Sequence, residues 1–202
     1  MVFLVVIAAA VALGLLLGGR LGAMAEVNVR AVWLFYLAIL IQIVAFPSGV
    51  LPWSIDDGAA RVLWLASYAC LGAAAVANRR LAGAPVVALG MLLNLVAIVA
   101  NKGHMPGLPH ALREAGINSQ LHNNSIAMAD PNLSWLVDRW ATPTWIPLGN
   151  VYSVGDVILA VGAFVLVLSA MKVPCRRRSA CDSGAPNRRG TCAAAHRLES
   201  GS

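Results

Sequence analysis

SVGDVILAVGAFVLVLSAMKV, residues 153–173, is the stretch that decides the fold, because only Asp156 and Lys172 in it carry a charge. A helix needs about 20 mostly apolar residues to cross a bilayer, so this stretch predicts a transmembrane helix. Four other stretches are similarly apolar: residues 1–19, 31–46, 59–77 and 81–100. We therefore expect an all-α fold, a polytopic membrane bundle of about five transmembrane helices.

The composition of the whole chain favours a lipid environment. Of its 202 residues, 59% are hydrophobic and only 12% are charged, and the mean hydropathy is +0.73. A soluble domain has about 45–50% apolar and about 25% charged residues, so this chain has too little charge to cover a water-facing surface. The lipid bilayer is its expected partner. We expect a transmembrane domain over residues 1–173 and a disordered, basic, cytoplasmic tail over residues 174–202.

The distribution of basic residues predicts the orientation. If all five stretches cross the membrane, Arg20, Arg30 and residues 79–80 lie on the same side as the basic cluster 172–178, and the loop 101–150 lies on the other. The positive-inside rule then places the N-terminus outside and the C-terminus in the cytoplasm. The tripeptide 23–25 resembles a signal-peptidase site, but no basic residue precedes the first apolar stretch, so we expect that helix to remain uncleaved. The basic charge accompanies no folded basic face, so no nucleic acid partner is expected.

The loop 101–150 is too long for a minimal connection and predicts a cap outside the membrane. It holds three of the four histidines and three tryptophans. Residues 109–116 predict a short helix with proline at its start and glycine at its end. Residues 132–140 carry apolar side chains at helical spacing, which predicts a second short helix lying along the bilayer surface. Glycines at residues 14, 18, 22, 72, 155 and 162 predict faces where helices approach closely.

Three motifs carry a resemblance to a known family: Asn101-Lys-Gly-His-Met-Pro106, Leu136-Val-Asp138 and Val151-Tyr-Ser-Val-Gly-Asp156. They resemble the DUF5317 family of bacterial multi-span membrane proteins, closely over residues 89–168 and only by hydropathy before that. Lys102 departs from the family pattern, in which glycine often occupies this position. The resemblance implies a helical membrane fold in the bacterial plasma membrane, and it implies no activity.

Polar residues at the outer ends of the fourth and fifth apolar stretches form a candidate binding pocket. Asp156 opens an apolar helix, where it either caps the helix with Ser153 or acts in a site. A buried Asn94 would either bond to a neighbouring helix or line the pocket. The candidate residues are Asn94, Asn101, His104, His122, Asp138 and Asp156.

Motifs for cofactors are missing from the sequence. It contains no phosphate-binding glycine loop, dinucleotide fingerprint or C-x-x-C-H haem motif, and no histidine lies in the predicted transmembrane stretches. The cysteines Cys70, Cys175, Cys181 and Cys192 match no compact zinc pattern, so no metal site is predicted. The sequence therefore identifies no particular cofactor.

Two functions remain open. The first is a binding or structural role, in which the cap of a small membrane subunit contacts a protein partner, a second copy of the chain or lipid. The second is a membrane enzyme or transporter that uses the polar pocket formed by the fourth and fifth stretches. The sequence does not decide whether the protein is an enzyme.

Overall fold

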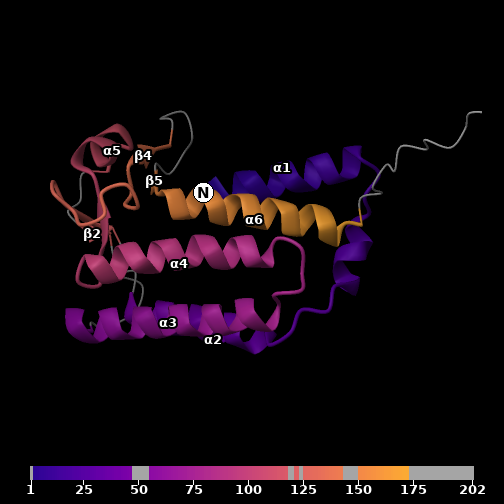
Figure 1. Ribbon diagram of the computed structural model, residues 1–202, viewed down its shortest axis with the longest axis horizontal. Coiled ribbons are helices and arrows are strands. Elements are labelled where there is room, and N and C mark those ends of the chain that lie inside the picture. The colour runs from indigo at the N-terminus through magenta and orange to yellow at the C-terminus, as the bar shows by residue number, and fades with distance from the viewer. Residues whose placement is uncertain (1, 47–54, 118–120, 123–124, 143–149, 173–202) are drawn as a thin grey trace, which may run out of the picture.

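Five long helices lie side by side in the computed structural model (Figure 1). They are α1 (Val2–Leu16), α2 (Val32–Ala45), α3 (Asp57–Ala77), α4 (Ala84–Ala100) and α6 (Val154–Ala170). Each falls within or beside one of the five apolar stretches, so the helical fold class is confirmed. The structure describes residues 2–46, 55–117, 121–122, 125–142 and 150–172. The predicted tail, residues 174–202, lies outside the described residues.

Packing between helices follows the order α1, α6, α4, α3, α2. Ala10 of α1 packs against Val167 at the end of α6 and Met171 just beyond it. At the other side of the bundle, the Gln42 side-chain amide donates a 3.1 Å hydrogen bond to the Ser67 hydroxyl and joins α2 to α3. The helices therefore form a continuous row, as Figure 1 shows for α1, α6, α4 and α3.

Glycines bring α4 and α6 into backbone contact. A Cβ atom added at Gly90 would lie 2.6 Å from the Gly155 carbonyl oxygen, and one added at Gly162 would lie 2.5 Å from the Val87 backbone nitrogen. The predicted close approach at residues 155 and 162 is therefore confirmed. Gly14 also packs closely, against the Met171 side chain. An added Cβ at Gly22 or Gly72 meets nothing within 4 Å, whereas Ala74, in the predicted face 72–77, is fully buried.

The basic residues that five successive membrane crossings would place on one side lie near one end of the bundle. The short 3-10 helix η1 (Leu21–Glu26) follows α1 there, and the exposed Glu26 forms an ion pair with Lys172 beyond α6. Asn78, at the end of α3, clamps the backbone of Arg30: its Oδ1 accepts from the Arg30 nitrogen and its Nδ2 donates to the Arg30 oxygen, both at 2.8 Å. The basic residues near this end are Arg20, Arg30, Arg79, Arg80 and Lys172.

The cap lies at the opposite end (Figure 1). Its first sheet has the order β1 (Met105–Gly107), β3 (Ser125–Ala127), β2 (Leu121–His122), with β1 parallel and β2 antiparallel to β3. A second antiparallel pair joins β4 (Trp140–Ala141) to β5 (Val151–Tyr152) just before α6. The predicted helix at residues 109–116 is confirmed as α5 (Pro109–Glu114), and Gly116 follows it with φ +71°.

The predicted surface helix at residues 132–140 is wrong. This segment forms turns, in which Leu133 has a φ of +54°, and then continues into β4. Leu136 and Val137 are 2% and 0% exposed, and Leu136 packs against Ala97 and Ile98 near the end of α4. Leu136 and Val137 therefore face protein, whereas Leu133 and Trp140 are exposed, and contacts distant in sequence override the helical spacing.

Apolar side chains also cover the outside of the bundle. Leu16, Tyr36, Val62 and Val99, on α1 to α4, are 84%, 69%, 67% and 61% exposed. By length and composition, α3 is the one described helix that is long and apolar enough to cross a membrane. The other long helices are apolar but shorter.

Candidate functional site

Asn94 and Asp156 meet where α4 passes the start of α6. The Asn94 Nδ2 donates to Asp156 Oδ1 at 2.8 Å, and the Ser153 hydroxyl lies 2.9 Å from Asn94 Oδ1. Ser153 is 0% exposed and Asn94 is 6% exposed, so both need these partners. The predicted interhelical bond of Asn94 is confirmed, with Asp156 as its acceptor.

Asp156 also caps its own helix. Its backbone nitrogen donates to the Ser153 hydroxyl at 3.1 Å, and its Oδ2 accepts from the Ser153 backbone nitrogen at 3.0 Å. These reciprocal bonds form a capping box, which confirms the capping interpretation. The same carboxylate therefore satisfies a helix terminus through one oxygen and joins two helices through the other.

Asp138 lies close to this cluster from the side of the cap. Its backbone nitrogen donates to the Pro106 oxygen at 3.0 Å and its backbone oxygen accepts from the Leu108 nitrogen at 2.9 Å, which fixes the residue against β1. The side chain is buried. Burial, followed by the negative charge of Asp156, raises the pKa of Asp138 to about 8. The Tyr68 phenol of α3 interacts electrostatically with both carboxyl groups.

Asn101 has a different partner. Its Nδ2 donates to the Asn132 oxygen at 3.0 Å, and its Oδ1 accepts from the Asn132 nitrogen at 2.9 Å. The same Nδ2 also donates to the Ala97 oxygen at 2.8 Å, one turn back on α4. Asn101 therefore fastens the cap to the end of α4.

The two predicted histidines have other surroundings. Lys102 and Gly103 both have positive φ, so the chain turns there. The turn places His104 Nε2 3.5 Å from Arg61 Nη1 at the start of α3. The backbone of His122 pairs with Ser125, and its side chain lies outside the described residues. Of the predicted pocket residues, the structure therefore brings together Asn94, Asp138 and Asp156.

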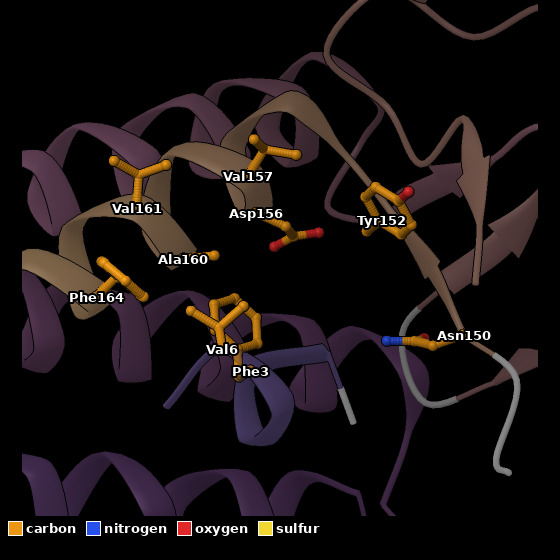
Figure 2. A pocket seen from close by; sticks show the side chains of 9 residues that line it. All are labelled: Phe3, Val6, Asn150, Tyr152, Asp156, Val157, Ala160, Val161 and Phe164. Carbon is orange, nitrogen blue, oxygen red and sulfur yellow. The ribbon is translucent and has the colours of Figure 1, made fainter. Parts of the chain in front are cut away.

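A cavity of about 480 Å³ opens between α1 and α6, beside Asp156. Figure 2 shows the Asp156 carboxyl group pointing into it from the first turn of α6. Most of the wall is apolar, and polar atoms come from the acid, one amide and one phenol. The lining residues are Phe3, Val6, Asn150, Tyr152, Asp156, Val157, Ala160, Val161 and Phe164. Asn94 supports this cavity from behind Asp156 rather than forming its wall, so the site differs from the predicted pocket between the fourth and fifth stretches.

The rim of the cavity near the cap is held in place by backbone and ring contacts. The Asn150 nitrogen donates to the Thr142 hydroxyl at 2.8 Å, and the Thr142 nitrogen donates to the Asn150 oxygen at the same distance. Tyr152 packs against Trp140, with ring centroids 5.8 Å apart. The two cap residues that line the cavity are thus positioned by Trp140 of β4 and by Thr142, which follows it.

The sequence analysis did not predict that Tyr68 interacts with Asp138 and Asp156. It also did not predict that Phe3 and Asn150 line the cavity beside Asp156. Phe3 and Asn150 reach the cavity only because α1 and the cap both dock against α6, and no local pattern signals this docking. Tyr68, a phenol within an apolar stretch, was a visible signal. Among the described residues, no group of His, Cys, Asp and Glu side chains could hold a metal ion.

A comparison with known protein families matches the part of the chain that contains this site. Residues 26–168 match a family described as a family of unknown function (DUF5317). No curated protein and no solved structure matches the chain. The matched region contains α2 to α5, the cap and all of α6 except its last two residues, including Asp156.

Proposed function

The chain belongs to the DUF5317 family, and from its structure we propose that it is a multi-span protein of the bacterial plasma membrane that binds an amphiphile. In this proposal the helices lie in the bilayer with the N-terminus outside and the C-terminus in the cytoplasm. The apolar part of the ligand occupies the cavity between α1 and α6, and its polar end lies at Asp156.

The exposed apolar surface supports the membrane part of the proposal. A helix that is apolar on all sides is either buried in a large protein or lies in lipid. Here α1 to α4 all expose large apolar side chains, and the row of helices leaves their outer faces uncovered. The 17 residues of α4 and of α6 span roughly 26 Å at about 1.5 Å per residue, which approaches the bilayer hydrocarbon thickness of about 30 Å.

The two ends of the bundle support the orientation. Basic residues gather near η1 and the end of α6, and the positive-inside rule favours a cytoplasmic location for such an end. The cap at the other end exposes Trp135 and Trp140 by 54% and 40%. Tryptophan is enriched at the level of lipid headgroups, so the cap would rest on the outer surface of the membrane.

The cavity is the observation that carries the binding function. Its volume of about 480 Å³ lies within the range of about 300–1,000 Å³ that ligand sites occupy. Such sites combine apolar walls with a few polar groups that orient the ligand. The cavity has this composition, with Asp156 and Asn150 near the cap and with Val161 and Phe164 farther along α6.

Photolabelling of the purified protein tests this function. A long-chain alcohol that carries a diazirine should label peptides from α1 and α6. The variant Ala160→Trp fills the cavity from the middle of its wall and should reduce this labelling about tenfold, the effect of losing about 1.4 kcal/mol of binding. Ala73→Trp is the matched control, because Ala73 is an exposed alanine of α3 outside the cavity. Labelling spread evenly over all helices, or unchanged in Ala160→Trp, would contradict the proposal.

The raised pKa of Asp138 favours a second candidate function, in which binding or transport is coupled to the movement of a proton. A carboxyl group whose pKa is raised to about 8 beside Asp156 could exchange a proton when a ligand changes its surroundings. Alcohol labelling should then depend on pH in the wild type and lose that dependence in Asp138→Asn. Equal pH profiles for the two proteins would exclude this coupling.

A further inference from the structure

Among the described residues that line the cavity, one side chain is acidic and none is basic. Asp156 is the acid, and the remaining polar groups of the wall belong to Asn150 and Tyr152. Figure 2 shows the Asp156 carboxyl group facing the space between Tyr152 and Phe3. A ligand lying in the cavity therefore meets this carboxylate at the end near the cap.

The described side chains do not neutralise this carboxylate. Its bonded neighbours, Asn94 and Ser153, carry no charge. In the described part of the chain, the one ion pair joins Glu26 to Lys172 at the far end of the bundle. Arg139, a basic residue of the cap, lies 5.5 Å from the Trp140 ring centroid instead. A negative charge beside a largely apolar cavity is costly without a cationic partner.

Aromatic rings line the same space. Phe3 and Tyr152 contribute to the cavity wall near Asp156, and Phe164 contributes to it farther along α6. The face of an aromatic ring attracts ammonium cations, and rings recur in sites for quaternary ammonium groups. A carboxylate together with aromatic rings thus complements an ammonium group in both charge and surface.

We infer that the cavity prefers amphiphiles with a cationic head group, an amine or a quaternary ammonium, which pairs with Asp156 while the alkyl chain packs along α1 and α6. This inference rests on the proposed binding function. An anionic head group would be repelled by Asp156, and a neutral one would leave its charge uncompensated. A bare metal ion is a poor fit, because hard cations need several oxygen ligands and this wall is mostly apolar.

Three photoactivatable probes with the same alkyl chain and different head groups test the inference: an amine, an alcohol and a carboxylic acid. Each is added to the full chain in neutral maltoside micelles, and labelling of α1 and α6 peptides is quantified by mass spectrometry. We expect the amine to label about tenfold more than the alcohol, the ratio that corresponds to one favourable charged contact. The acid should label least. The three probes differ in how they partition into the micelle, so variants are needed to separate this effect from the preference of the cavity.

Variants then assign the preference to Asp156. Asp156→Asn should lower amine labelling to the level that the alcohol shows in the same variant. Asp156→Glu keeps the charge at a position where glutamate also completes a capping box, so it should keep most of the preference. Because partitioning of each probe into the micelle is the same for all variants, it cancels in the comparison.

The two proposals fail in different ways. Equal labelling by amine and alcohol, or a preference that survives in Asp156→Asn, would overturn the inference and leave the binding function intact. Alcohol labelling that persists in Ala160→Trp would instead overturn the binding function itself.

Discussion

The side-chain amide of Asn94 donates a 2.8 Å hydrogen bond to Oδ1 of Asp156 and so joins α4 to the first turn of α6. Removal of the amide in Asn94→Ala leaves this oxygen without its donor from α4. A buried group that loses its partner costs about 1–3 kcal/mol, so we expect destabilisation of that size. Thermal unfolding followed by tryptophan fluorescence in detergent measures it. Leu92→Ala, exposed on the same helix, is the control and should change stability much less; equal losses would contradict the prediction.

The glycine contact between α4 and α6 predicts opposite effects for two similar substitutions. In Gly90→Ala the new methyl group would lie 2.6 Å from the Gly155 oxygen, and such overpacking typically costs about 1–3 kcal/mol. In Gly72→Ala the methyl group meets nothing within 4 Å, so its better helix propensity should add up to about 1 kcal/mol. Unfolding temperatures of the two variants should therefore move in opposite directions. A shift of the same sign in both would argue against backbone contact between α4 and α6.

Asn101 and Asn78 predict local loosening at opposite ends of the molecule. Asn101→Ala removes both bonds to the Asn132 backbone, so amide hydrogen exchange should accelerate in the cap segment 125–142. Asn78→Ala removes the bonds to Arg30 and should accelerate exchange around residues 27–32 instead. Mass spectrometry of peptic peptides resolves the two regions. Faster exchange at both ends in either variant would show general rather than local destabilisation.

Asp138 predicts a dependence of stability on pH. Its pKa is about 8 in the folded protein against a usual value of 3.8, so the folded state binds more protons than the unfolded state between these values. The contribution of Asp138 to stability is therefore complete below about pH 4, decreases as the pH rises, and is lost above about pH 8. The unfolding temperature of the wild type should fall between about pH 5 and about pH 9, and it should fall less in Asp138→Asn.

The exposed Asp130 of the same cap provides the control for this measurement. Asp130→Asn should retain the pH dependence of the wild type. If Asp138→Asn and Asp130→Asn behave alike, the titrating group is not Asp138.

The proposed orientation predicts the accessibility of single cysteines. In a chain whose native cysteines are replaced by serine, His110→Cys in α5 should react with a membrane-impermeant maleimide added to intact cells. Ala82→Cys, exposed between α3 and α4 at the other end of the bundle, should react only after the cells are opened. Reaction of both cysteines in intact cells would refute the proposed topology.

The helices could be predicted from the sequence because their signals are local. An apolar stretch of about 15–20 residues defines a helix without knowledge of its neighbours. The capping box of Ser153 and Asp156 lies within four consecutive residues and was equally readable. An interhelical hydrogen bond from Asn94 could be predicted, because a buried amide needs a partner. The sequence did not identify Asp156 as that partner.

The cap and the cavity depend on contacts between distant residues. The spacing of the apolar residues predicts that Leu136 lies in a helix. In the structure Leu136 lies in a turn, because the end of α4 offers it a buried position. The cavity exists only where α1, α6 and the residues around Asn150 converge. No pattern within any one of these segments specifies that convergence, so the cavity shares Asp156 with the predicted pocket and has different walls.

Asn78 and Asn101 fasten the two ends of the bundle with the same device, an amide that bonds to both polar groups of one distant residue. Because these attachments carry no net charge, added electrolyte does not screen them, unlike the exposed pair of Glu26 and Lys172. They also contain no sulfur, so reducing agents leave them intact. Both attachments should therefore hold at any ionic strength and redox potential at which the bundle itself stays folded.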